Sequence, residues 1–218
     1  ECTIEWTAYG YVPPVHYEPD KYSHKVTLTS FIHSAVNVLV VRIYNDMEGG
    51  WGNGIRFSYW RERDVAAGES VIHKEGRYRY IQQELPGGEY FVFMADVSEE
   101  EAEIDEGLGK IEGRCTPSGK ECLLYLTLVT SRDSKQPVKQ AIENLEVAKE
   151  SGWDQLVKSH RKWWHSFWSR GYVSTPFDTL EKYWYYALYL QGCICRPGRL
   201  SPGLQGNWIK ENYPAWNA

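Results

Sequence analysis

Residues 77–94, RYRYIQQELPGGEYFVFM, decide the fold of the first half of the chain. Both ends of this stretch are rich in aromatic and β-branched side chains, which favour strands. The Pro-Gly-Gly sequence at 86–88 separates them, and it is typical of a tight turn, because proline presets φ and glycine tolerates positive φ. The sequence therefore predicts an antiparallel hairpin with strands at 77–83 and 89–94.

Similar strand-like runs lie on both sides of this hairpin. They span residues 25–31, 36–43, 57–63 and 123–129, and Gly, Asn, Asp and Pro residues separate them. No helical periodicity lies between them. Short strands at this spacing are typical of antiparallel sheets packed face to face, so we predict a β-sandwich over residues 1–131.

The pattern becomes helical after residues 131–137, a polar segment that ends in a proline suited to a first helical turn. Apolar residues recur at helical spacing over 138–148, and Gly152 ends that run. A second helix is predicted over 154–168, because it begins at an aspartate suited to the N-cap. These two helices form a predicted helical linker, residues 132–170.

The second linker helix carries four large aromatic side chains in six residues. Helical spacing places Trp164 over Trp168 and Trp163 over Phe167. So many large apolar rings are unsuited to an exposed helix, and we predict that this stripe is clamped between two bodies.

A third helix is predicted from Asp178, which with Glu181 forms an aspartate variant of the capping box. Aromatic and aliphatic side chains then cover almost its whole circumference over 183–190, a pattern typical of a buried helix. One such helix cannot form a domain, and we expect the segment 171–218 to begin a further helical body.

Composition excludes several classes of function. The 218 residues carry 24 basic and 29 acidic side chains, a net charge of −5, which argues against a nucleic-acid binder that neutralises phosphates. No apolar stretch approaches ~20 residues, so we expect a soluble protein with neither nucleic acid nor membrane as partner. The compartment (bacterial cytoplasm, periplasm or secreted) stays open. The 10 Trp and 16 Tyr suit sugar-binding clefts as well as ordinary packing.

Motifs for cofactor or metal chemistry are absent. The sequence has no Gly-x-Ser-x-Gly, no phosphate-binding Gly-rich loop, no His-Glu-x-x-His and no Cys-x-x-Cys, so no cofactor and no metal is predicted. The acidic run at 99–106 lacks calcium-loop spacing and favours a solvated loop. Five cysteines are few for a disulfide-framed module, and whether Cys115 and Cys122 form a bridge across a turn stays open.

The C-terminal part carries a more specific pattern. It consists of WWHSFWSR at 163–170, LEKYWYYALYL at 180–190, RPG at 196–198, LQGNW at 204–208, and Trp216. In content and order, over residues 123–218, this pattern resembles the family-95 glycoside hydrolases. In that family a helical linker joins an N-terminal β-sandwich to an (α/α)6 barrel.

The resemblance implies a fold and an activity. Residues 1–131 would be the C-terminal part of an N-terminal β domain, and 171–218 the start of a truncated (α/α)6 barrel. The implied activity is inverting hydrolysis of α-L-fucosides or related α-L-galactosides, with carbohydrate as substrate and the remaining barrel of the same protein as partner. Inversion requires two carboxyl groups ~6.5–9.5 Å apart, with room for water.

The resemblance also assigns residue roles. By position in the motif, Gln205, Asn207, Trp208 and Trp216 are expected to line the substrate cleft, although packing under the barrel rim is an equal alternative for them. The family's catalytic residues follow the position of Trp216, so no catalytic residue is predicted here and this polypeptide alone is expected to be inactive. The alternative function is a non-catalytic carbohydrate-binding or protein-docking β-sandwich module.

One departure from the family concerns Cys193 and Cys195. They stand before the Arg-Pro-Gly sequence, where the family usually has small hydroxyl residues. Cysteine is of similar size, so the packing is compatible, but the sugar preference stays open.

Overall fold

The computed structural model describes residues 2–9, 23–45, 55–60, 70–85, 87–98, 103–107, 110–115, 117, 119–198 and 202–203. The chain divides into two compact units, Glu1–His160 and Arg161–Ala218. All strands of the described ranges belong to the first unit, and this unit contains a β domain of the predicted class.

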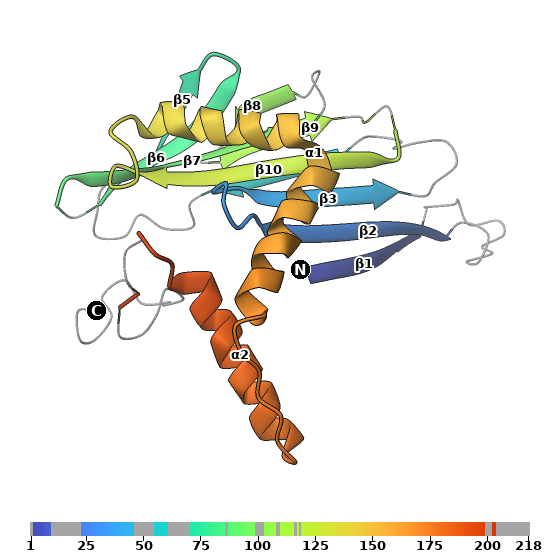
Figure 1. The fold of residues 1–218 in the computed structure, drawn as a ribbon. Coiled ribbons are helices and arrows are strands. Elements are labelled where there is room, and N and C mark those ends of the chain that lie inside the picture. Colours follow the sequence, from blue (N-terminus) through green and yellow to red (C-terminus); the bar gives the residue numbers. More distant parts are fainter. Residues whose placement is uncertain are drawn as a thin grey trace. The chain divides into compact units, whose positions relative to one another are not determined.

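Two antiparallel sheets form the first unit (Figure 1). The larger sheet has the order β1-β2-β3-β10-β7-β6-β5, and the smaller has the order β4-β9-β8. The strands are β1 (Cys2–Tyr9), β2 (Ser23–Ile32), β3 (Leu39–Asn45), β4 (Ile55–Trp60), β5 (Val71–Glu75), β6 (Tyr78–Leu85), β7 (Glu89–Val97), β8 (Glu103–Gly107), β9 (Lys110–Cys115) and β10 (Glu121–Thr130).

The predicted hairpin of residues 77–94 is confirmed as β6 and β7. The two strands pair antiparallel with Ile81 opposite Phe93. Gly87 and Gly88 have φ values of 97° and 81°, which non-glycine residues rarely adopt. The turn therefore forms where the sequence placed glycines.

The two sheets pack face to face through alternating apolar side chains. Tyr59 and Ile111 of the smaller sheet are buried together with Ile81 of the larger one. The Tyr59 ring meets Phe93 edge-on at 5.0 Å, and its hydroxyl donates a hydrogen bond to the Arg79 carbonyl at 2.7 Å. This packing explains the alternation of apolar residues along the strands.

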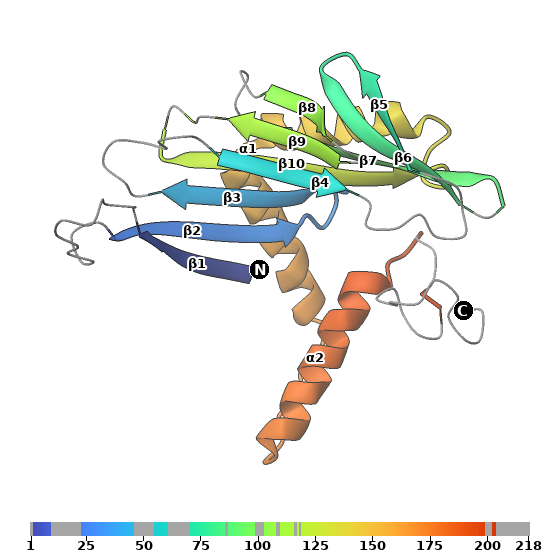
Figure 2. The same ribbon diagram turned by 180° about the vertical axis from the view of Figure 1, so that it is seen from behind.

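The part of helix α1 (Pro137–Trp168) that belongs to the first unit, up to His160, lies across the opposite face of the larger sheet, as Figures 1 and 2 show from the two sides. Its residues Ala141, Leu145, Ala148 and Leu156 are buried in one core with Val40, Val92, Met94 and Tyr125 of the sheet. Burying a leucine side chain such as Leu145 contributes ~1.5–3 kcal/mol. The helix is thus the third layer of the β domain.

Gly152 interrupts α1 with φ 67° and ψ 170°. The two predicted helices therefore meet at a kink, and the glycine supplies a backbone conformation that other residues rarely adopt. After the kink, Trp153 packs edge-on against Phe31 at 5.4 Å. The first unit thus includes both sides of the kink.

The second unit contains the end of α1 and helix α2 (Asp178–Ile194). The predicted aromatic stripe is confirmed within α1: the ring centroids of Trp163 and Phe167 are 5.6 Å apart, and those of Trp164 and Trp168 are 5.9 Å apart. Trp164 also stacks on Tyr189 of α2 at 5.3 Å. The contact of the stripe with a second body stays a prediction, as do the domain boundaries at 131 and 170.

One expectation for α2 was wrong, and one stays a prediction. Tyr183 and Tyr186 are 67% and 60% exposed, and Gly192 is the one buried residue between Asp178 and Ile194. Burial of the other faces of α2 by a further helical body therefore stays a prediction. The N-cap residue is Phe177 rather than Asp178, and Glu181 accepts a hydrogen bond from the Thr175 N–H at 3.0 Å.

Candidate functional site

The four predicted substrate-lining residues, Gln205, Asn207, Trp208 and Trp216, lie outside the described residues. The structure therefore tests none of them. It does describe the turn that precedes them, where Arg196 donates a hydrogen bond to the Gly192 carbonyl at 3.2 Å. The Arg196 guanidinium also lies 4.2 Å from the Trp163 ring centroid, in a cation–π contact.

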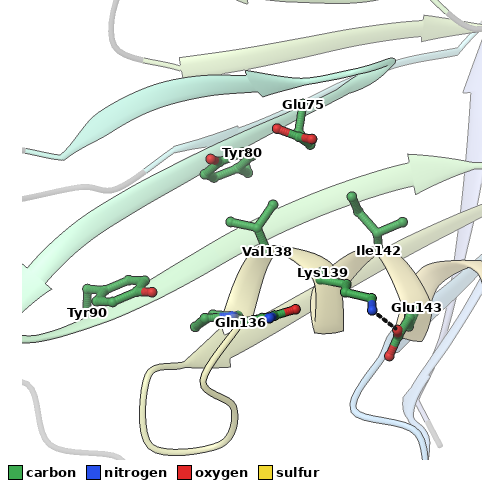
Figure 3. Close-up of a pocket in the computed structure, with 9 residues that line it drawn as sticks. Glu75, Tyr80, Tyr90, Gln136, Val138, Lys139, Ile142 and Glu143 are labelled. Carbon is green, nitrogen blue, oxygen red and sulfur yellow. Dashed lines mark ion pairs between the residues drawn. The ribbon is translucent and has the colours of Figure 1, made fainter.

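A pocket in the first unit is a candidate site in the described part of the chain. Its volume is about 570 Å³. It opens between strands β5, β6 and β7 of the larger sheet and the first turns of α1 (Figure 3). Sequence reasoning missed this site because its lining comes from four elements and follows no motif.

The sheet side of the pocket is formed by Glu75, Tyr80 and Tyr90. Tyr80 on β6 pairs with His73 on β5, and the two rings stack with centroids 5.2 Å apart. Burial raises the pKa of Tyr80, and the nearby Glu75 and Tyr90 raise it further. The Tyr80 hydroxyl therefore stays protonated at neutral pH and can donate a hydrogen bond.

The segment before α1 holds Tyr90 in place. The Tyr90 N–H donates to the Ser131 hydroxyl at 3.1 Å, and the Ser131 N–H donates to the Tyr90 carbonyl at 2.8 Å. This reciprocal pair joins the end of the sheet to the loop that leads into the helix. The backbone of Tyr90 at the pocket is thus held by two hydrogen bonds to Ser131.

The helix side combines polar and apolar groups. Val138 and Ile142 extend from α1 toward Tyr80 and Glu75, as Figure 3 shows. The Gln136 carbonyl accepts the first helical hydrogen bond, from the Gln140 N–H at 3.0 Å. Because Gln136 immediately precedes the helix, its side-chain amide stands at the pocket wall.

Three polar groups of this pocket have no hydrogen-bond partner in the described part of the chain. Among the residues that the structure describes, no hydrogen bond engages the side-chain hydroxyls of Tyr80 and Tyr90 or the carboxamide of Gln136. Together these groups offer both donors and acceptors toward one cavity. They are free to bind a ligand or water.

A second polar cluster, around Asp96, fastens α1 to the sheet. Arg77 donates to both Asp96 carboxylate oxygens at 2.6 Å, and Lys149 of α1 lies 3.0 Å from one of them. Nearby, the Tyr78 hydroxyl donates to the Glu146 carboxylate. Both carboxylates are already engaged, so this cluster docks the helix and does not supply a free acid or base.

His33 and Ser159 lie in contact but do not form a nucleophilic dyad. The His33 Nδ1 atom accepts hydrogen bonds from the N–H groups of Ala35 and Val36, at 3.2 and 3.0 Å. The proton therefore resides on Nε2, which lies 2.9 Å from the Ser159 hydroxyl oxygen and donates to it. A general base would need its lone pair there instead. No cluster of His, Cys, Asp or Glu within the described ranges could hold a metal ion.

One part of the sequence matches the model of a known protein family. The sequence model for "Glycosyl hydrolase family 65, N-terminal domain" matches residues 111–167, which span β9, β10 and most of α1. No curated protein matches the chain. Neither helix of the described part is long and apolar enough to cross a membrane.

Two solved structures share a distant similarity. A "Putative kojibiose phosphorylase from human microbiome" is 12% identical, with a TM-score of 0.47, over 67% of this chain and 22% of that one. A bacterial glucoamylase complexed with acarbose is 13% identical, with a TM-score of 0.43, over 68% of this chain and 25% of that one. The chain thus spans a quarter or less of the length of these proteins.

The comparisons support the coarser part of the sequence inference and do not support the finer part. Over residues 111–167 the chain is glycoside hydrolase-like, with a β domain followed by a helix. The matching model is that of family 65, so family 95 and its α-L-fucoside specificity are not supported by it.

Proposed function

We propose that this chain is the β domain, helical linker and first helical segment of an enzyme that cleaves glycosidic bonds. The observation that carries the proposal is the family-65 N-terminal domain match at 111–167, where the last strands lead into α1. The antiparallel β domain supports it, and so does the order of the aromatic motifs after residue 163.

The proposed roles of the two parts follow from the family resemblance, which places the catalytic residues after the position of Trp216. The proposal therefore assigns the catalytic acid and base to a helical barrel that begins at 171–218. In the first unit, the Asp96 and Glu146 carboxylates are engaged in attaching α1 to the sheet. In this proposal Gln205, Asn207, Trp208 and Trp216 line the sugar cleft. The β domain then has a supporting role, with the linker helix as its attachment.

The proposal for the substrate is more specific than the proposal for the enzyme class, and fewer observations support it. Hydrolysis of α-L-fucosides or α-L-galactosides with inversion is supported only by the motifs between residues 163 and 216. Cys193 and Cys195 depart from that pattern. The substrate is therefore best tested with a panel of sugars rather than with fucosides alone.

The test begins with the reading frame beyond residue 218. A frame that continues with several hundred residues of helical hairpins is expected. The protein encoded by the whole frame is then assayed on 4-nitrophenyl glycosides, including α-L-fucoside, α-L-galactoside and α-D-glucoside, and the anomer released is identified by NMR. Hydrolysis by the longer protein, together with an inactive 218-residue chain, supports the proposal.

A matched pair of variants tests the proposed cleft. Gln205→Ala in the longer protein should raise KM or lower kcat/KM at least tenfold. Gln155→Ala, at an exposed position of α1, should leave both unchanged. A frame that ends near residue 218, or a longer protein that cleaves no glycoside, would overturn the enzyme proposal and favour the binding or docking module.

A further inference from the structure

We propose that the pocket between β5, β6, β7 and the start of α1 binds an uncharged oligosaccharide. Its volume of about 570 Å³ lies within the roughly 300–1,000 Å³ of small-molecule sites. The cavity is thus large enough for more than one sugar ring.

The lining has the mixed character that sugars require. A pyranose ring presents hydroxyl groups around its rim and C–H groups on its faces. The pocket offers the unpartnered Tyr80 and Tyr90 hydroxyls and the Gln136 carboxamide for the hydroxyl groups. Val138 and Ile142 provide apolar contact beside them. Hydroxyls and amides both donate and accept, and so can match a hydroxyl in either role.

The charge of the lining selects against anionic ligands. Glu75 and Glu143 are acidic, and Lys139 is the basic residue among those that line the cavity. The Lys139 ammonium already lies 3.9 Å from the Glu143 carboxylate, in an ion pair across one helical turn. Both side chains of this pair are exposed, so it is weak, but two carboxylates and one ammonium give the lining a net charge of about −1. A phosphate or a sugar acid would therefore meet net negative charge.

The pocket is preorganised by the fold. The Tyr80 ring is stacked on His73, and the Tyr90 backbone is joined to Ser131 by two hydrogen bonds. On the helix side, Ala141 and Leu145 anchor the first turns of α1 in the core. The two tyrosine positions and the helix backbone therefore need little ordering when a ligand binds, which reduces the entropic cost of association, whereas the exposed Gln136 side chain is ordered by the ligand.

This inference does not depend on the glycosidase proposal. It uses only residues of the first unit, between Glu75 and Glu143, and it assigns them no catalytic role. The β domain would hold a saccharide whether or not the whole protein cleaves one.

The test is isothermal titration calorimetry of the 218-residue chain with oligosaccharides of different charge. The uncharged probes are maltopentaose, cellopentaose, β-1,4-galactopentaose and 2′-fucosyllactose. The charged probes are a chitosan pentamer, which is cationic, and pentagalacturonate, which is anionic. We expect at least one uncharged probe to bind with a Kd of about 1 mM or below and pentagalacturonate not to bind.

Conservative variants locate the binding. Gln136→Ala and Tyr90→Phe each remove one hydrogen-bonding group without disturbing the core, and each should weaken the bound probe roughly three- to tenfold, the usual worth of one hydrogen bond. The control, Gln155→Ala, removes an exposed carboxamide from α1 outside the pocket and should leave Kd unchanged. Unchanged thermal unfolding midpoints verify that the variants are folded.

Three results would overturn the inference. The first is that no uncharged probe binds at 10 mM. The second is that only the chitosan pentamer binds. The third is that the Kd of a bound probe is the same for Gln136→Ala and Tyr90→Phe as for the control Gln155→Ala. Binding to the pocket with no glycosidase activity in the longer protein would refute the proposed enzyme but keep this site. Glycosidase activity of the longer protein without binding to the pocket would refute this site and support the proposed enzyme.

Discussion

Replacing Asp96 by asparagine tests whether the buried ion cluster holds α1 on the sheet. The Asp96 side chain is 1% exposed, and it accepts hydrogen bonds from Arg77, from Lys149 of the helix and from the Val97 N–H at 2.9 Å. Asp96→Asn keeps the volume and removes the charge. The NH2 group of the asparagine would also face Arg77 or Lys149, and both partners would then be hydrogen-bond donors.

The expected cost follows from the exposure of the two partners. Lys149 is 17% exposed, so leaving its ammonium desolvated and without the carboxylate costs ~1–2 kcal/mol. Exchanging a charge-assisted hydrogen bond for a neutral one adds ~1–1.5 kcal/mol. Arg77 is 47% exposed, and water screens its charge, so its ion pair contributes less than ~1 kcal/mol. The free energy of unfolding of the first unit should therefore fall by ~2–4 kcal/mol.

The measurement must report on the first unit alone. Amide hydrogen exchange of β7 and β10 at increasing urea gives the free energy of opening for these strands. The matched control is Glu121→Gln, which removes the ion pair with Arg42 at 2.6 Å, between two partly exposed side chains, and should cost less than ~1 kcal/mol. A loss below 1 kcal/mol for Asp96→Asn, or one no larger than that of the control, would refute the docking role of the cluster.

Three further predictions concern the same unit, and urea unfolding checks each. Burial raises the pKa of Tyr125 from 10.0 to about 12, so the folded state holds this proton more tightly. The contribution of Tyr125 to stability is therefore present below pH 10 and is lost between pH 10 and 12, by ~1.4 kcal/mol at pH 11. Tyr125→Phe should remove this share of the alkaline loss and leave the share of Tyr59 and Tyr78, whose pKa values burial also raises. Gly152→Ala should lower the free energy of unfolding by ~1–3 kcal/mol, because alanine is strained at a φ of 67°. Gly119→Ala, where an added Cβ meets no atom, should lower it by less than ~0.5 kcal/mol. Equal losses for the two variants would contradict the strain at Gly152. Ser159→Ala removes the acceptor of the His33 Nε2–H and should cost ~1–2 kcal/mol; a loss under ~0.5 kcal/mol would show that the contact is not stabilising.

Local patterns predicted the elements well because they depend on neighbouring residues. The hairpin at 77–94 follows from a turn sequence between two strand-forming runs. The stacking of Trp163 on Phe167 follows from helical geometry alone. The break at Gly152 follows from the weak helix propensity of glycine, and the structure confirms all three.

Burial was harder to predict because it depends on what surrounds an element. The composition of α2 is typical of a buried helix, but Tyr183 and Tyr186 are exposed, because among the described residues α1 is the one helix beside it. The sequence motif at 204–216 likewise predicts a sugar cleft, but those residues lie outside the described ranges. These inferences concern surroundings that a local pattern does not encode.

The sequence by itself indicated six of the ten described strands, the turn at 86–88 and the helices after residue 137, and over 111–167 it is glycoside hydrolase-like. It did not indicate β1, β5, β8 or β9, and the loop expected at 99–106 was wrong where β8 pairs with β9. Only the tertiary structure decided that β10 lies between β3 and β7, that Asp96 meets Lys149, and that Tyr80 shares a pocket with Gln136. The physical reason is that propensity acts between residues a few positions apart. Sheet order, buried ion pairs and pockets arise when the whole chain buries its apolar surface, which joins residues far apart in the sequence.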